Sequence, residues 1–324
     1  MFKTRITDLF GIKYPIVQGA LGGGLANAEL VAAVSNAGGL GMITALNYGS
    51  SQELREAIRQ TRKLTKNPFA VNVTLLPTLR RIPSEEYFAA ALDEGVRIFD
   101  TSGRSPEEFV PMVKNKGGIF MHKVGTPRHA ITAERIGCDA VSVVCFESGG
   151  HPLPDDVGAA VLIPACINAV KIPVIQAAGV VDGRGLISAL ALGAEGVLMG
   201  TRFVMSKECP FNPKLKEWFK QLTEKDTILV HRTINNNERV VRTPFTEMIL
   251  GMEEKGARLD EILPLISGEK VRSAYQTGDY TNAIITAGQT VGLIHDVPTV
   301  KEIIDRMISQ AEVVMKRLEK ITKG

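Results

Sequence analysis

The sequence predicts an α/β protein, a (β/α)8 TIM barrel with a smaller, mostly helical second domain. Three observations support this fold. Short β-rich runs recur at intervals of roughly 20–35 residues, about the length of one strand-and-helix unit. Helical patterns fill the intervals between the runs. Glycines cluster directly after the apolar runs, where α/β folds need tight turns and close approach to ligands.

The β-rich runs predict eight strands. They are residues 14–18, 40–44, 69–73, 97–100, 118–122, 140–144, 174–177 and 196–199. Alternation of such strands with helices favours a closed parallel barrel. An open doubly wound sheet is the alternative, and it would usually carry a GxGxxG motif after its first strand. The first run is followed by QGALGGG at residues 18–24, which does not match that spacing.

Several helices are also legible between the strands. Residues 27–37 end at Gly38-Gly39, a common helix stop. Residues 51–66 carry apolar side chains at helical spacing. Residues 185–192 are small and apolar on all sides, which predicts a helix packed tightly on the sheet.

The pattern changes after residue 205. Residues 206–285 contain charged helical segments around an extended patch at 239–242, which predicts a smaller domain over the C-terminal mouth of the barrel. The chain then returns to an apolar, glycine-rich segment and a long closing helix at 300–321. We therefore expect residues 1–205 plus 286–324 to form the barrel with its closing helix, and residues 206–285 to form a lid.

Composition excludes several classes of protein. The formal net charge is +3 and the basic residues are scattered, so no nucleic-acid surface is expected. No apolar run reaches the ~18 residues of a membrane span, and no signal peptide is expected at the N-terminus. The four cysteines form no CxxC pair, which predicts reduced thiols and no metal site. Together these features predict a cytoplasmic protein.

The most informative stretch is residues 173–203. Two apolar runs there end in small residues, the first in Ala178-Gly179 and the second in Gly200-Thr201. Such ends can place backbone N–H groups around one anion, as the last two units of a TIM barrel do for phosphate. The alternative at Thr201 is a simple helix N-cap. We predict a phosphate site at these four residues.

Other strand ends carry polar groups suited to a heteroaromatic ring. Gln18-Gly19 end the first strand, Asn72 and Thr74 end the third, and Lys123 ends the fifth. Amides can bond the donor–acceptor edge of a ring, and a lysine can face a ring atom that gains negative charge on reduction. A ring of that kind with a phosphate tail describes FMN. The alternatives are that Asn72 caps a turn and that Lys123 is merely solvated.

His151 is the candidate catalytic residue. It follows Gly149-Gly150 at the predicted barrel mouth, so its backbone can approach a ligand. A histidine there can act as a general base or orient a substrate proton, because its pKa lies near neutrality. The alternative is a loop histidine that only packs on the ligand. Nearby Glu147 and Asp155-Asp156 match no metal motif, so no metal is predicted.

These features coincide with a known family. The sequence resembles the nitronate monooxygenase (2-nitropropane dioxygenase) family of FMN-dependent barrels, which includes NADH:quinone reductases and FMN-type enoyl-[acyl carrier protein] reductases. The resemblance covers nearly the whole chain. It is carried by YPIVQGA, NAGGLGMI, FAVNVTLLP, MHKVGTPRHA, AVSVVCFESGGHP, PVIQAAGVVDGRG, ALGAEGVLMGTRFVMSKE and TAGQTVGL. Two departures from the family pattern are present. Ala20-Leu21-Gly22-Gly23 stand where the family often has Gly-Gly-Met and an aromatic residue, and Ala178 stands where the family often has glycine.

The resemblance implies FMN at the barrel mouth and His151 as the active-site histidine. It places Gln18, Gly19, Asn72, Thr74 and Lys123 along the ring and ribityl chain. Gln289 comes near the flavin from the returning C-terminal segment. The phosphate falls to Gly179, Gly200 and Thr201.

The resemblance also implies an activity, with a small-molecule substrate. The expected reaction is oxidation of alkyl nitronates with O2 to a carbonyl compound and nitrite. The alternatives are an NAD(P)H:quinone reductase and an enoyl-thioester reductase, with NADH or NADPH as cosubstrate. Specificity is expected in the loop at 20–24, the loop at Pro77 and the lid. Outside redox chemistry, a flavin-free isomerase or lyase acting on a phosphorylated substrate and a non-catalytic binding protein stay open, as does a homodimer.

Overall fold

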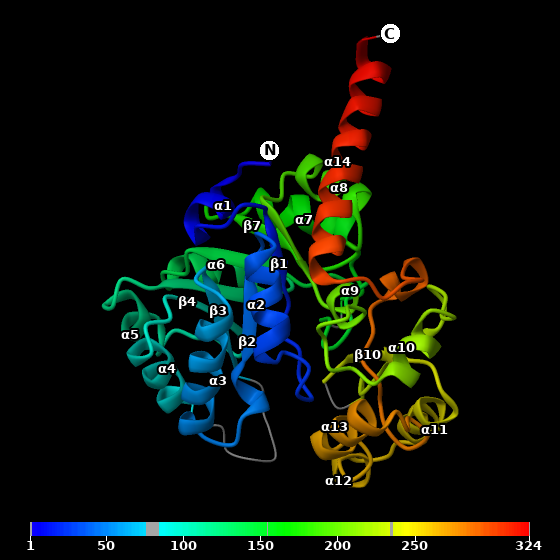
Figure 1. The fold of residues 1–324 in the computed structure, drawn as a ribbon. Helices are drawn as coiled ribbons and strands as arrows, with labels where there is room; N and C mark the ends of the chain where they lie inside the picture. The colour runs from blue at the N-terminus through cyan, green and yellow to red at the C-terminus, as the bar shows by residue number, and fades with distance from the viewer. Residues whose placement is uncertain (1, 76–83, 154, 234–235, 324) are drawn as a thin grey trace.

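The computed structural model describes residues 2–75, 84–153, 155–233 and 236–323 (Figure 1). Its main sheet has eight parallel strands in the order β1-β8-β7-β6-β5-β4-β3-β2. A parallel bridge between Val17 and Leu40 joins the two ends of this order and closes the barrel. The strands are β1 Ile16–Gln18, β2 Gly41–Thr44, β3 Phe69–Leu75, β4 Ile98–Gly103, β5 Ile119–Val124, β6 Ala140–Val143, β7 Val174–Gln176 and β8 Gly196–Met199. The predicted TIM barrel is confirmed.

Helices follow the strands and cover the outside of the barrel (Figure 1). The helices of the barrel half are α1 Arg5–Phe10, α2 Ala28–Asn36, the 3-10 turn η1 Ala45–Asn47, α3 Ser51–Leu64, α4 Ser84–Asp93, α5 Val110–Lys114, α6 Pro127–Arg135, α7 Ala159–Ile167 and α8 Gly183–Ala191. Helix α3 begins where the Ser50 side chain accepts a hydrogen bond from the backbone N–H of Glu53. It ends in a basic turn that suits the helix dipole. The helices predicted from periodicity are therefore present.

The barrel interior is filled by one apolar layer and is not a pore. Its buried apolar side chains come from all eight strands, from Leu40 at the bridge and from the residue directly after β7, namely Val17, Leu40, Met42, Ala70, Ile98, Met121, Ala140, Ile175, Ala177 and Leu198. Polar side chains follow on two of the same strands. Asn72 lies two residues beyond Ala70, and Asp100 two residues beyond Ile98. The interior therefore turns from apolar to polar towards the carboxyl ends of the strands.

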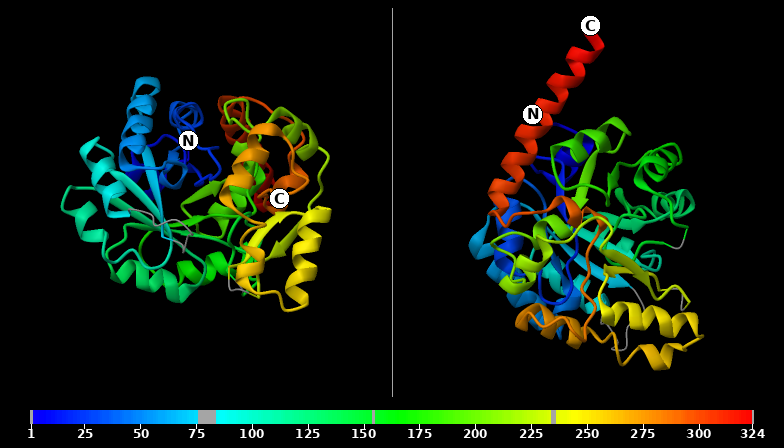
Figure 2. Two further views of the ribbon diagram at one scale, coloured as in Figure 1. Left: turned by 90° about the horizontal axis from the view of Figure 1, so that it is seen from below. Right: turned by 90° about the vertical axis from the view of Figure 1, so that its right-hand side faces the viewer.

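Residues 206–285, here called the lid, contain helices and a small sheet. The elements from β8 through the lid are α9 Thr201–Val204, α10 Pro213–Phe219, β9 Thr227–Val230, β10 Glu238–Val241, α11 Pro244–Glu254, α12 Leu259–Ile262 and α13 Gly268–Thr277. Strands β9 and β10 pair antiparallel, and β10 is the extended patch expected from the sequence. Figure 2 shows the lid beside the barrel. The boundaries at 205/206 and 285/286 stay a proposal.

Bridges from β10 join the lid to the barrel half. Arg239 pairs with Gly150, and Val240 pairs with Thr286. Both bridges are antiparallel. Strand β10 therefore has β9 along one edge and, along its other edge, both the loop that follows β6 and the segment that returns from the lid.

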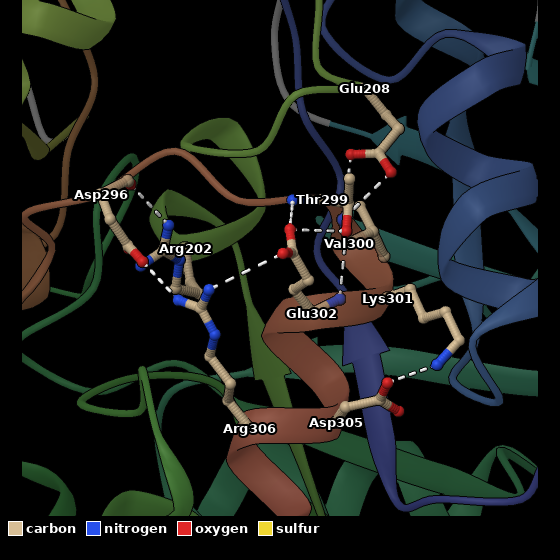
Figure 3. A network of polar contacts seen from close by, with 9 residues as sticks. All are labelled: Arg202, Glu208, Asp296, Thr299, Val300, Lys301, Glu302, Asp305 and Arg306. Atoms are coloured by element: carbon tan, nitrogen blue, oxygen red, sulfur yellow. Dashed lines mark hydrogen bonds and ion pairs between the residues drawn. The ribbon is translucent and has the colours of Figure 1, made fainter.

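The closing helix α14, Val300–Lys323, is anchored to the end of β8 by the polar network in Figure 3. Arg202, directly after Gly200-Thr201, donates to Asp296 at 2.9 Å, and Arg306 of α14 donates to the same carboxylate at 2.6 Å. The Glu208 carboxylate accepts from the first backbone N–H of the helix at 2.9 Å. These bonds fix the position of the β8 end relative to α14.

Helix α14 packs on α8 and α2, and its C-terminal half projects beyond the barrel (Figure 1). All four cysteines are buried and free. Within the described ranges, no helix combines the length and apolarity needed to cross a membrane.

Candidate active site

A cavity of about 880 Å³ opens at the carboxyl ends of the barrel strands, between the barrel and the lid. Its volume lies in the upper part of the range seen for small-molecule sites. Most of the predicted site residues line it. They are Gly19, Thr74, Lys123, His151, Ala178, Gly179, Gly200 and Thr201. The chain therefore brings together groups from strands that are far apart in sequence.

One end of the cavity has the character of an anion site. Gly179 has a φ of 69°, a conformation that favours glycine. Within the described residues, the backbone N–H groups of Gly179, Gly200 and Thr201 donate to no protein acceptor. A Cβ placed on Gly200 would meet Leu21 alone among described atoms, at 3.6 Å, so the backbone there is open to a ligand. This end fits a phosphate group.

Thr201 also links this end to the returning C-terminal segment. Its hydroxyl accepts a hydrogen bond from the backbone N–H of Gly288 at 3.0 Å. The hydroxyl proton is thereby left to donate elsewhere. Gln289, the next residue, donates its backbone N–H to the backbone oxygen of Glu147 at 3.0 Å. Gln289 therefore lies beside the cavity without lining it.

Two side-chain amides that were predicted to bond the edge of a heteroaromatic ring, Gln18 and Asn72, lie beneath the cavity surface. The Gln18 side chain is fully buried and exchanges hydrogen bonds with the backbone of Met42, at 3.0 and 3.3 Å. Asn72 is also fully buried and donates to the Asp100 carboxylate at 2.6 Å. Its oxygen accepts from the Thr74 hydroxyl at 3.0 Å. Thr74, two residues later on the same face of β3, is the one that reaches the cavity.

Lys123 reaches the cavity from β5 and is not a free surface lysine. Its ammonium group forms an ion pair with Asp100, whose side chain is fully buried. Burial raises the pKa of Asp100, and the neighbouring Lys123 and Asn72 oppose that rise. Sequence reasoning missed Asp100. The available signal was an acidic residue at the end of an otherwise apolar run.

His122, next to Lys123, also lines the cavity. Its Nδ1 atom lies 2.8 Å from the Thr101 hydroxyl. Burial, together with the positive charge of Lys123, lowers the pKa of His122 to about 4. The ring is therefore neutral at pH 7, and the only fixed cation contributed by this pair of residues is Lys123.

His151 lies at the mouth of the cavity, held by the lid. Its Nδ1 atom is 2.9 Å from the backbone oxygen of Asn237. A carbonyl oxygen only accepts, so Nδ1 carries the proton in this contact and Nε2 of the neutral ring is left as an acceptor. The tautomer is assigned from this hydrogen bond. The histidine thus presents a basic nitrogen away from the lid strand.

The backbone around Gly149 and Gly150, directly before His151, explains why both positions are glycine. A Cβ on Gly149 would lie 2.6 Å from the backbone nitrogen of Gly288, so this loop and the returning segment touch through their backbones. Gly150 has a φ of 76° and exchanges backbone hydrogen bonds with Arg239, at 2.6 and 3.2 Å. The loop is therefore wedged between two segments.

Arg239 strengthens this attachment from within the lid. Its guanidinium donates twice to the oxygen of Phe146, at 2.9 and 3.1 Å, and lies over the Phe146 ring. It also donates to the Thr227 hydroxyl at 3.1 Å. Sequence reasoning located this strand but did not assign Arg239 or Asn237 to the site.

The lid supplies an apolar part of the cavity wall through Ile266, Val271 and Ile284. Leu21 and Gly22, from the loop where the sequence departs from the pattern of the family it resembles, also line the cavity. The other predicted specificity loop, at Pro77, lies outside the described residues. Glu147 accepts from the N-terminal N–H of α7. Among described residues, no three His, Cys, Asp or Glu side chains are arranged to hold a metal ion.

Comparison with known proteins shows the family of the chain. The model of the family described as nitronate monooxygenase matches residues 3–310. The chain belongs to the nitronate monooxygenase family. It is thereby an oxidoreductase, as predicted.

Three similar proteins illustrate the range of this family. FabK from Thermotoga maritima superposes with a TM-score of 0.91 at 34% identity, over 99% of this chain and 100% of that one. A probable nitronate monooxygenase of Staphylococcus saprophyticus is 30% identical, over 97% of this chain and 99% of the relative. The (3aS,4S,5R,7aS)-5-hydroxy-7a-methyl-1-oxo-octahydro-1H-indene-4-carboxyl-CoA dehydrogenase of Rhodococcus jostii is 29% identical, over 98% and 97%.

Proposed function

We propose that this protein is an FMN-dependent oxidoreductase that acts on an acyl thioester. The chain's own residues fit FMN. Gly179, Gly200 and Thr201 offer unpaired donors for a phosphate, and Lys123 and Thr74 offer polar groups further along the same cavity. When bound, FMN would supply the hydride and electron transfer of the reaction. The residues around it bind, orient and exclude water.

The observation that carries the substrate class is the roof of the cavity. Ile266, Val271 and Ile284 of the lid extend an 880 Å³ cavity with apolar surface beyond the polar groups at the strand ends. An acyl chain can bury against such a wall, at about 0.8 kcal/mol for each CH₂ removed from water. A short nitronate would leave most of this wall wet. The CoA-thioester substrate in the name of the Rhodococcus relative supports the same class.

His151 has the central role among the chain's own groups. In the oxidising direction its Nε2 atom accepts a proton from the substrate. In the reducing direction Nε2 first takes a proton from solvent and then delivers it to the substrate, while the nicotinamide supplies the electron pair. The Asn237 oxygen keeps the ring in the orientation that allows this, because it holds the Nδ1 proton. The proposed reaction is reduction of the double bond of an enoyl thioester, with NADH or NADPH as the source of the electrons.

Nitronate oxidation is the second candidate. It is favoured by the Staphylococcus relatives named as probable nitronate monooxygenases, one of them matched over nearly its whole length. For that reaction His151 would orient or deprotonate the nitro compound. A quinone acceptor stays a third choice and is tested in the same experiment.

One anaerobic experiment separates these reactions. The flavin-loaded protein is mixed with NADH or NADPH, and the bleached sample is divided among crotonyl-CoA, a quinone and buffer. A separate oxidised sample receives propyl-2-nitronate. We expect bleaching by a nicotinamide and recovery of colour with crotonyl-CoA. Bleaching by nitronate alone would reject the thioester reaction, and recovery with quinone alone would favour a quinone reductase.

A further inference from the structure

A buried network runs beneath the cavity floor and reaches its surface at both ends. Thr74 donates to Asn72 at 3.0 Å, Asn72 donates to Asp100 at 2.6 Å, and Lys123 forms an ion pair with the same Asp100 oxygen, Oδ2. Thr74 and Lys123 line the cavity, whereas Asn72 and Asp100 have no exposed surface. Two groups that face a ligand are therefore joined through two that cannot touch it.

The charges in this network are unequally exposed. The Lys123 side chain is 15% exposed and faces the cavity, while the Asp100 side chain is 0% exposed. The second carboxylate oxygen of Asp100, Oδ1, has no hydrogen-bond partner among the described residues. A charged carboxylate is costly to bury, and the neighbouring Lys123 cation opposes that cost. The pair as a whole contributes almost no net charge to the cavity floor.

Other charged groups near this floor are already committed. His122 is held neutral by burial. Glu147 accepts from the first turn of α7, and Arg104 is paired with Glu108. Lys123 is therefore the fixed cation best placed to respond to charge in the ligand, and Asp100 is the group that cancels it.

We propose that Asp100 is a positioning residue that sets the reduction potential of the bound flavin through Lys123. This inference rests on the proposed FMN site. Asp100 fixes the direction of the ammonium group and offsets its charge. A flavin gains negative charge on reduction, and an unpaired lysine would stabilise that charge. Because Lys123 is paired with Asp100, it stabilises the reduced flavin less than an unpaired lysine would. Removing the carboxylate charge would release that stabilisation.

A double-mutant cycle tests the proposal. The variants are Asp100→Asn, Lys123→Met and the double variant, with Asp93→Asn on the outer surface as the matched control. The readouts are the dissociation constant for oxidised FMN and the midpoint potential of the bound flavin. Both are measured without substrate, so they are independent of activity.

We expect Asp100→Asn to favour reduced over oxidised flavin by about tenfold or more, a potential about 30 mV higher for two electrons. Lys123→Met should lower the potential, and the double variant should return towards the wild type. Asp93→Asn should match the wild type. An unchanged potential in a folded, FMN-loaded Asp100→Asn variant would overturn the proposal.

Two further outcomes keep the test decisive. If Asp100→Asn does not fold, the Lys123→Met variant decides alone. Asp100 is proposed to act through Lys123, so an unchanged flavin potential in Lys123→Met would overturn the proposal. If the wild-type protein binds no FMN, the proposed function itself is wrong. If the protein binds FMN but both substitutions leave the flavin potential unchanged, only the role of Asp100 is wrong.

Discussion

The Nδ1 atom of His151 lies 2.9 Å from the backbone oxygen of Asn237, so a strand of the lid orients the histidine at the barrel mouth. The barrel supplies the phosphate end of the cavity and the lid supplies the orientation of its base. Neither part alone completes the site, because the loop that carries His151 is paired with β10 through Gly150.

Replacing His151 tests its role in proton transfer. His151→Ala should retain FMN, because the phosphate residues lie on other strands, and should lose about 10²–10⁴-fold in turnover. Flavin content by absorbance and turnover under saturating donor measure the two effects. His295→Ala, an exposed histidine near the last helix, is the control and should keep full activity. Wild-type turnover in His151→Ala would reject the catalytic assignment.

Gly200 tests the phosphate end. Its φ is −104°, and a Cβ there would lie within 4 Å of Leu21 alone among described atoms, so the backbone accepts a side chain and we expect Gly200→Leu to disturb the apo-protein little. It should nevertheless weaken FMN binding by a hundredfold or so, about 2.7 kcal/mol, because the side chain would occupy the space of the phosphate. Isothermal titration with FMN and the apo-protein melting temperature separate these effects. Gly251→Leu in the lid helix α11 is the matched control. Equal FMN affinity in Gly200→Leu and wild type would place the phosphate elsewhere.

Arg239 tests the attachment of the lid to the His151 loop. Arg239→Met keeps the apolar stem but leaves the Phe146 oxygen and the Thr227 hydroxyl without their donor. We expect a loss of about 1–3 kcal/mol in unfolding free energy, measured with urea. Turnover should fall more than FMN affinity. Arg242→Met, which removes an exposed pair with Glu247, should change stability by less than about 0.5 kcal/mol. Similar losses in both variants would argue against a special role for Arg239.

The lowered pKa of His122 predicts that the folded protein loses stability in mild acid. Its folded-state pKa of about 4 lies below the ordinary 6.5, so between these values the unfolded chain binds a proton that the folded chain excludes. The contribution of the neutral ring is therefore complete above pH 6.5 and declines as the pH falls towards 4. The slope from this one group is at most about 1.4 kcal/mol per pH unit. In His122→Gln, urea unfolding from pH 7 to 4.5 should show a weaker dependence of the unfolding free energy on pH, because the variant lacks the one proton that His122 takes up on unfolding. An unaltered slope would contradict the buried neutral state.

Much of the fold could be predicted because each barrel strand contains a short apolar stretch, and glycines or helix signals lie between most of these stretches. The predicted run 196–199 coincides with β8, and the run 174–177 differs from β7 by one residue. The phosphate end was likewise predictable, since its chemistry comes from backbone groups at positions that strand ends define. Small residues such as Gly179 and Gly200 mark those positions in the sequence.

The depth of a side chain within the barrel could not be predicted. Asn72 and Thr74 lie on the same face of β3, yet one is buried beneath the floor and the other reaches the cavity. That difference depends on the stagger of the closed sheet, which periodicity does not reveal. The ion pair of Asp100 with Lys123 joins two strands and needs the register to be found. The hairpin β9–β10 has no short turn motif between its strands, so its pairing was missed.

Titration of the purified apo-protein with FMN decides whether the cavity holds a flavin. We expect saturable binding of one FMN per chain, with a resolved flavin band at about 450 nm that NADH or NADPH bleaches without oxygen. The Gly200→Leu protein should bind far more weakly in the same titration. Absence of any bound flavin in the wild-type protein at saturating FMN would contradict the account, because the free donors of Gly179, Gly200 and Thr201 would then belong to another phosphate.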